Sequence, residues 1–141
     1  MMTADSTLPA KEGVDAENNQ YLERFILSHE HTYQTALKEI KKGRKETHWI
    51  WWIFPQMAAL GKSERSKFYG FPNRDKAAAF LKHPILGQHL REITQAVYDS
   101  PRTPYEIFGS DAIKFRSCML LFDSIETNSI FNKVLRKWRW K

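Results

Sequence analysis

A chain of 141 residues with one cysteine cannot form an internal disulfide, and its sequence holds no Cys/His cluster with zinc spacing. This length is sufficient for one domain with a substantial core and no such staples. The sequence lacks the roughly 18 consecutive apolar residues that span a bilayer and an apolar secretion signal near its first residues. We therefore expect a cytoplasmic protein, in a reducing compartment and without membrane contact.

The net charge of +6 is distributed unevenly along the sequence. Residues 1–17 carry four carboxylates and one lysine, so the residues from Asn18 onward carry a net charge of +9. Such a basic body attracts phosphates, nucleic acids and anionic small molecules, although basic surface is also a common means of solubility. Because residues 1–17 are also poor in aromatic residues, we predict a disordered acidic tail at 1–17 and a single domain over 18–141.

The first predicted helix is capped by Asn18 or Asn19 and ends at Gly43. Its apolar residues recur at three- and four-residue steps, the pattern of an amphipathic helix. This stripe consists of Leu22, Phe25, Ile26, His29, Tyr33, Ala36, Leu37 and Ile40. We expect His29 to be a satisfied core residue rather than a ligand, because it falls on the apolar stripe.

An aromatic run, Thr47–Gln56, lies at the centre of the prediction. It places three tryptophans and a phenylalanine close together, between His48 and Gln56. Each ring can bury roughly 150–250 Å², so the run belongs in the core. Its apolar residues do not alternate, which favours a short buried helix or turn ended near Pro55.

The remaining segments carry helix signals in close succession. Ser63 can cap a short helix through Phe68, and Asn73 can cap a helix over residues 74–82. Pro84 suits the first position of a helix that runs to about Tyr98. Thr103 and Glu106 have the spacing of a capping box, with Gly109 as the stop.

Two more helices complete the chain. The first starts at Ser110 or Asp111 and is expected to be central; it holds Ile113, Phe115, Ser117, Leu120 and Leu121. The second is amphipathic and holds Ile130, Phe131, Val134, Leu135 and Trp138. With about seven helical segments and no convincing strand, the sequence predicts an all-α, compact single-domain bundle around the Trp-rich segment.

The familiar catalytic motifs are missing from the sequence. It contains no glycine-rich phosphate loop, no His-Glu-x-x-His and no nucleophile elbow. Cys118 lies in an apolar helix, where a lone cysteine usually fills the core. We predict no metal site and no cofactor, and we assign no catalytic residue.

A first candidate ligand site is aromatic. It groups His48, Trp49, Trp51 and Gln56 with Tyr69, which lies in a second aromatic run on a loop. Indole and phenol rings stack on planar bases, while His and Gln can read the edges of a base or move a proton. The alternative is a packed core whose polar tips are satisfied by the backbone.

A second candidate site is cationic. Lys114, Arg116 and Ser117 lie close to the start of their helix. Cations near a helix N-terminus oppose the helix dipole unless an anion joins them, which indicates a phosphate or carboxylate site. The alternative is a pair of solvated cations.

The C-terminal residues 133–141 hold five cations, two tryptophans and no acid. A basic and aromatic composition suits single-stranded nucleic acid or an acidic surface, with Arg136, Lys137 and Arg139 as the contacts. The alternative is a solvated helix face that frays at its end.

Several motifs in order resemble one bacterial family. These are Gly43-Arg44-Lys45, His48-Trp49-Ile50-Trp51, Ile53-Phe54-Pro55-Gln56, Ser66-x-Phe68-Tyr69-Gly70, His83-Pro84-x-Leu86-Gly87, Ile107-Phe108-Gly109 and Lys114-x-Arg116-Ser117. The chain is thereby similar to the family called domain of unknown function 1810. The resemblance implies a compact, mainly helical domain and no established activity; the label calpastatin that such proteins often carry in genomes has no support in this sequence.

A fainter similarity, in the Phe-Tyr-Gly loop and the ring-lined pocket, is to the all-helical N-glycosidases that act on ADP-ribose-like substrates. One hypothesis is therefore a site for a planar, phosphorylated small molecule, with hydrolysis of an N-glycosidic bond as its chemistry. That reaction needs a carboxylate near the sugar, for which Glu46, Glu106 and Asp111 are the candidates. The other hypothesis is a non-catalytic module that binds an acidic protein or RNA through its basic end; the sequence leaves the oligomeric state open.

Overall fold

A computed structural model describes residues 9–58 and 62–141. These residues fold into α1 (Pro9–Lys42), α2 (Ile50–Ile53), α3 (Glu64–Tyr69), α4 (Arg74–Lys82), α5 (Pro84–Asp99), α6 (Pro104–Phe108), the 3₁₀ turn η3 (Gly109–Asp111), α7 (Ala112–Ile125) and α8 (Ile130–Lys137). Within these ranges the only strand-like pairing is an isolated bridge between Met57 and Phe71. The predicted all-α class is confirmed.

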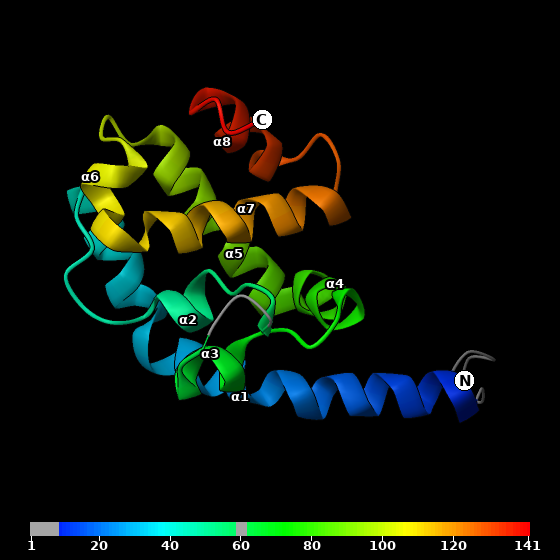
Figure 1. Cartoon of the computed structure of the whole chain (residues 1–141). Coiled ribbons are helices and arrows are strands. Elements are labelled where there is room, and N and C mark those ends of the chain that lie inside the picture. The colour runs from blue at the N-terminus through cyan, green and yellow to red at the C-terminus, as the bar shows by residue number, and fades with distance from the viewer. Residues whose placement is uncertain (1–8, 59–61) are drawn as a thin grey trace.

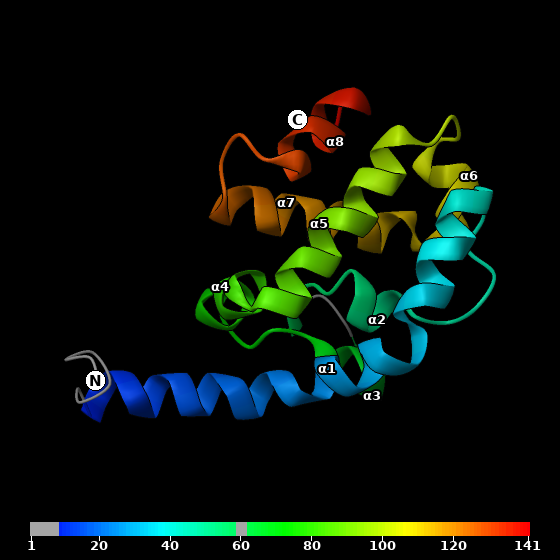
Figure 2. The same cartoon turned by 180° about the vertical axis from the view of Figure 1, so that it is seen from behind.

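The helices pack in crossed pairs rather than as a parallel bundle (Figures 1 and 2). α1 packs against α5, and α8 packs against both α5 and α7. Both views show that α1 changes direction part of the way along its length. The Thr32 hydroxyl donates to the carbonyl of Ser28, one turn earlier in α1, at 2.7 Å, and such a local bond often accompanies a helix bend.

One continuous core joins all the major helices. It is dominated by aromatic rings, including Phe25, Phe54, Phe71, Phe80, Phe115, Phe122 and Phe131. The predicted stripe of α1 lies in this core, His29 included, except that Ile26 is only half-buried. Such rings meet edge to face as well as stacked, and Phe54 and Phe115 lie edge to face with their centroids 4.9 Å apart.

The predicted caps at Ser63, Asn73 and Thr103 are confirmed. The side chain of Ser63 accepts the backbone N–H of Ser66, and that of Asn73 accepts the N–H of Lys76. Thr103 and Glu106 form the reciprocal capping box that their spacing predicts. Gly43 ends α1 with φ +94°, a backbone conformation that glycine adopts without strain.

The start of α1 differs from the prediction. The helix begins at Pro9 rather than at Asn18 or Asn19, so it includes residues 9–17 of the predicted tail. Asn18 does not act as a cap, because it lies inside α1. Its side-chain oxygen instead accepts a hydrogen bond from Lys76 in α4 at 2.8 Å. Residues 1–8 of the predicted tail lie outside the described residues.

The buried face of α7 also differs from the expectation of a central helix. Ala112, Phe115, Cys118, Met119 and Phe122 are buried, but Ile113 and Leu120 are exposed. The buried residues recur at three- and four-residue steps, so the intervening apolar residues face outward. Within the described ranges, none of the helices is long and apolar enough to cross a bilayer.

Candidate functional site

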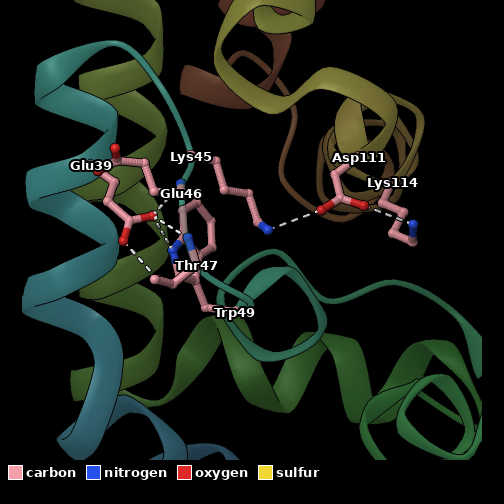
Figure 3. A network of polar contacts seen from close by, with 7 residues as sticks. All are labelled: Glu39, Lys45, Glu46, Thr47, Trp49, Asp111 and Lys114. Atoms are coloured by element: carbon pink, nitrogen blue, oxygen red, sulfur yellow. Dashed lines mark hydrogen bonds and ion pairs between the residues drawn. The ribbon is translucent and has the colours of Figure 1, made fainter.

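Beneath the aromatic run, one buried carboxylate collects a ring of hydrogen-bond donors (Figure 3). The carboxylate of Glu39 accepts the backbone N–H groups of Glu46 and Thr47, at 2.7 and 3.0 Å. It also accepts the hydroxyl of Thr47 at 2.6 Å and the indole N–H of Trp49 at 2.9 Å. Burial alone would raise the pKa of Glu39, but these hydrogen bonds outweigh burial and hold the pKa below its ordinary value. The carboxylate is therefore ionised at neutral pH.

A second carboxylate, Asp111, lies between two lysines (Figure 3). Its oxygens are 3.1 Å from the ammonium of Lys45 and 2.8 Å from that of Lys114. Burial would raise the pKa of Asp111, but the two lysines lower it further than burial raises it. Two cations therefore share one anion, and this triad keeps a net positive charge.

Each of the two lysines also lies against a tryptophan of the aromatic run. The ammonium of Lys45 is 5.1 Å from the ring centroid of Trp49, and that of Lys114 is 5.0 Å from that of Trp51. Both distances are within the range of cation–π attraction. The triad thus joins the start of α7 to the aromatic run.

A pocket of about 460 Å³ opens beside Trp51 and Lys114. The residues that line it are Trp51, Gln56, Lys62, Ser63, Ser110, Ile113, Lys114 and Ser117. They offer one indole wall, two ammonium groups, three hydroxyls and a carboxamide. Among the described residues that line the pocket, none carries a carboxylate, so the pocket is chemically suited to an anion that carries a flat ring.

The geometry of α2 brings Trp51 and Gln56 to this pocket. α2 is one turn long, and its Ile50 and Ile53 are buried. Trp52, the residue after Trp51, contacts α1 through two polar groups. His29 Nε2 lies 2.8 Å from the Trp52 carbonyl oxygen, and the Trp52 indole donates to the hydroxyl of Thr32.

The backbone then turns at Pro55, and the carbonyl of Gln56 accepts the N–H of Phe71 at 3.0 Å. Gln56 is 8% exposed. Its place in the pocket is therefore fixed by the main chain of the loop that follows α3.

The structure brings four of the eight predicted ligand residues together. Trp51 and Gln56, from the aromatic candidate site, and Lys114 and Ser117, from the cationic one, line the same pocket. The two sites that the sequence analysis treated separately are therefore one place in the fold. Whether they bind a ligand stays a prediction.

The other four predicted residues lie outside the lining. His48 is exposed, and Trp49 is buried with its indole directed at Glu39. The hydroxyl of Tyr69 lies 2.6 Å from that of Ser28 in α1. Arg116 is exposed, with its guanidinium 6.0 Å from the ring centroid of Trp140.

Sequence reasoning missed Lys62, Ser63, Ser110 and Ile113 as lining residues. Ser63 and Ser110 were considered only as helix starts. Lys62 gave no signal, since a lysine before a capping serine is typical of any exposed loop. Ile113 was assigned to the core, but one turn separates it from Ser117 on the same side of α7.

The predicted contacts of the basic C-terminal segment are partly engaged within the chain. Lys137 donates to the carbonyl of Tyr98 at 2.6 Å and lies over the rings of Tyr98 and Trp138. Arg136 and Arg139 are exposed. The Trp140 indole donates to the hydroxyl of Tyr105 at 3.1 Å, so this end folds back onto α6 and does not fray away from α8.

The candidate carboxylates for glycosidic chemistry are placed away from the lining. Glu106 is occupied by its capping box, Glu46 is exposed, and Asp111 reaches the pocket only through Lys114. Within the described ranges, no three His, Cys, Asp or Glu side chains gather as metal ligands would.

The fold and the site define a small all-helical domain with a cationic, aromatic-walled pocket. The chain belongs to the family described as "Protein of unknown function (DUF1810)", whose model matches residues 19–140. The family resemblance expected from the motifs is thereby confirmed.

A similar solved structure is that of the conserved hypothetical protein Rv1873 from Mycobacterium tuberculosis. It is 37% identical to this chain, with a TM-score of 0.79 over 82% of this chain and 85% of that protein. A comparison with curated proteins found no match. These comparisons establish the family and the fold, and they assign no activity.

Proposed function

We propose that the pocket beside Trp51 binds a planar, phosphorylated small molecule such as a nucleotide or an ADP-ribose-like compound. The observation that carries this proposal is the position of the Lys114 ammonium, 5.0 Å from the Trp51 ring centroid at the pocket wall. One wall can thus stack on a flat ring while the cation beside it meets the phosphate.

The charges support an anionic ligand. Lys62 and Lys114 both line the pocket, and Lys45 offsets part of the charge that Asp111 presents to Lys114. Three serine hydroxyls provide neutral donors for phosphate oxygens. A phosphate would therefore find charge and hydrogen bonds there without first displacing a carboxylate from the wall.

The size of the pocket also supports a compact ligand. Small-molecule sites typically measure about 300–1,000 Å³, and this pocket measures about 460 Å³. Trp51, Ile113 and the methylene groups of Gln56 supply apolar contact. Such a mixture of one ring wall and a few polar groups is typical of pockets for nucleotide-like molecules.

The proposal above concerns ligand binding alone. A more specific hypothesis is that the pocket also hydrolyses an N-glycosidic bond of the bound ligand. Of the three candidate carboxylates, Asp111 is bonded to a lining residue and is therefore the one we assign to that chemistry. It would have to exchange Lys114 for the sugar as positive charge develops at the anomeric carbon. Release of nicotinamide from NAD by the wild type, and its loss in Asp111→Asn, tests this hypothesis.

Isothermal titration of the full chain with ADP-ribose, NAD and AMP tests binding. We expect Trp51→Ala to weaken the binding about tenfold, since stacking contributes about 1–3 kcal/mol per base. Lys114→Gln should weaken it by a similar factor through the lost charge-assisted hydrogen bond. His48→Ala and Arg116→Gln are the matched controls, because both residues lie off the pocket, and both should bind as the wild type does. The absence of binding by all three compounds would overturn the proposal.

A further inference from the structure

Helix α7 leaves large apolar side chains in water on the side opposite to its buried face. Ile113 is 73% exposed and Leu120 is 41% exposed. Arg116 lies between them in the sequence, and the spacing of three, four and seven residues places all three on one side of the helix. An exposed aliphatic pair with a central cation is not explained by the packing of this chain.

The exposed side of α7 continues onto the neighbouring elements. The guanidinium of Arg116 lies over the half-buried ring of Trp140, and Trp140 meets Tyr105 of α6 at right angles. Tyr105 is itself 58% exposed. We call this surface the outer α7 face and define it by Tyr105, Ile113, Arg116, Leu120 and Trp140. It is contiguous, unlike the singly scattered apolar residues of an ordinary surface.

The charge of the outer α7 face is positive. From Ala112 to Phe122, α7 carries Lys114 and Arg116 and no carboxylate. The carboxylates at its two ends are both engaged, Asp111 by two lysines and Asp123 by Lys141. The ion pairs of the described residues do not include Arg116, so its guanidinium is available to an outside anion.

We propose that the outer α7 face binds an acidic amphipathic helix of another protein. Ile113 and Leu120 fit apolar residues spaced two turns apart on such a helix, while a flanking carboxylate of that helix pairs with Arg116. Two exposed aliphatic side chains favour a protein over a nucleic acid, whose bases stack on rings and whose backbone seeks cations. Trp140 and Tyr105 supply the kind of aromatic anchor that is enriched at protein interfaces.

Photo-crosslinking tests this proposal. The full chain carries benzoylphenylalanine at position 120, which does not line the pocket beside Trp51, and is irradiated in a lysate of the source organism. The matched control carries it at Ile85, which is 49% exposed on α5. We expect a protein adduct from position 120 but not from position 85, and its attachment site, mapped by mass spectrometry, should lie in an acidic helical segment.

Charge reversal separates a specific contact from capture of an arbitrary protein. Arg116→Glu should reduce the yield of this adduct at least several-fold, whereas Arg44→Glu, an exposed arginine on the loop after α1, should leave it unchanged. An adduct with RNA, an adduct with a second copy of this chain, no adduct beyond the position 85 control, or a yield that Arg116→Glu does not change would each overturn the proposal. None of these outcomes depends on the pocket beside Trp51.

Discussion

The carboxylate of Glu39 accepts the indole N–H of Trp49 at 2.9 Å inside the core. Glu39 is only 6% exposed, and it also holds the backbone and hydroxyl of the loop between α1 and α2. A buried carboxylate with four donors fixes the position from which the aromatic run starts. The orientation of Trp51 toward the pocket therefore depends on a residue that lies outside the run.

Glu39→Gln should lower the free energy of unfolding by about 3 kcal/mol, because the amide replaces an acceptor oxygen with a donor that faces other donors. Urea denaturation followed by circular dichroism measures the change. Glu46→Gln is the matched control, since only the backbone N–H of Glu46 takes part in this network. Equal stability of the two variants would show that the carboxylate of Glu39 is not required.

His29 makes the stability of the fold sensitive to acid. Its Nε2 donates to the carbonyl of Trp52, since a carbonyl can only accept, and its Nδ1 lies 2.9 Å from Nδ1 of His89. Burial is the main cause that lowers the pKa of His29 to about 4. The charges of His89 and His83 lower it further, whereas the hydrogen bond to Trp52 raises it. Glu92 also lies beside His89 and raises the pKa of that residue, against a larger lowering by burial.

The sign of the pH effect follows from where the proton binds. Between the ordinary pKa of about 6.5 and the folded value of about 4, the unfolded chain binds a proton that the folded chain does not. The contribution of neutral His29 to the free energy of unfolding is fully present above the ordinary pKa and is lost as the pH falls toward the folded value. The His29 contribution should therefore fall by about 2 kcal/mol from about pH 7 to about pH 5.

His29→Gln keeps a donor for the Trp52 carbonyl and removes the titration. Between about pH 7 and about pH 5, the free energy of unfolding of this variant should fall by about 2 kcal/mol less than that of the wild type. Urea denaturation at several pH values measures this difference. His31→Gln, an exposed histidine on the same helix, should keep the wild-type slope. An unchanged slope in His29→Gln would assign the acid sensitivity to other groups.

The helix starts were predictable from the sequence because capping is local. The side chain of Asn73 accepts the N–H of Lys76, three residues later. Thr103 and Glu106 bond each other's backbone N–H at the same spacing. Both patterns specify a helix start without help from the rest of the fold. The buried stripe of α1 was predictable for the same reason, since its period is a property of one helix.

The pocket could not be predicted in full, because its walls come from distant segments. Trp51 and Lys114 are far apart in the sequence, and nothing local shows that Asp111 draws Lys114 toward the aromatic run. Trp49 was assigned to the ligand site because indole rings stack on planar bases, but its indole N–H donates to Glu39 on the preceding helix. No local pattern in the sequence pairs Glu39 with Trp49.

Arg139 occupies a position that glycine would fill with less strain. It follows the end of α8 with φ +57°, and the N–H of Trp140 donates to the carbonyl of Leu135 at 2.8 Å while that of Arg139 donates to Arg136. This is the hydrogen-bond pattern of a Schellman motif, in which this position is usually glycine.

Arg139→Gly should stabilise the protein by about 1 kcal/mol, because a non-glycine residue pays roughly that amount in the left-handed region. Thermal or urea unfolding measures the gain. Arg136→Gly, within α8, is the opposite control and should cost about 1 kcal/mol of stability. A loss of stability in Arg139→Gly would mean that the arginine side chain matters more than the strain of its backbone.

The most direct test of the proposed pocket follows the indole N–H signals of the tryptophans by two-dimensional ¹H–¹⁵N NMR during a titration with ADP-ribose. The signal of Trp51 should shift progressively to saturation, whereas that of Trp49, buried against Glu39, should not. A Trp51 signal that does not shift at ligand concentrations up to about 1 mM would contradict the account. A dissociation constant of that size corresponds to a binding free energy of only about 4 kcal/mol.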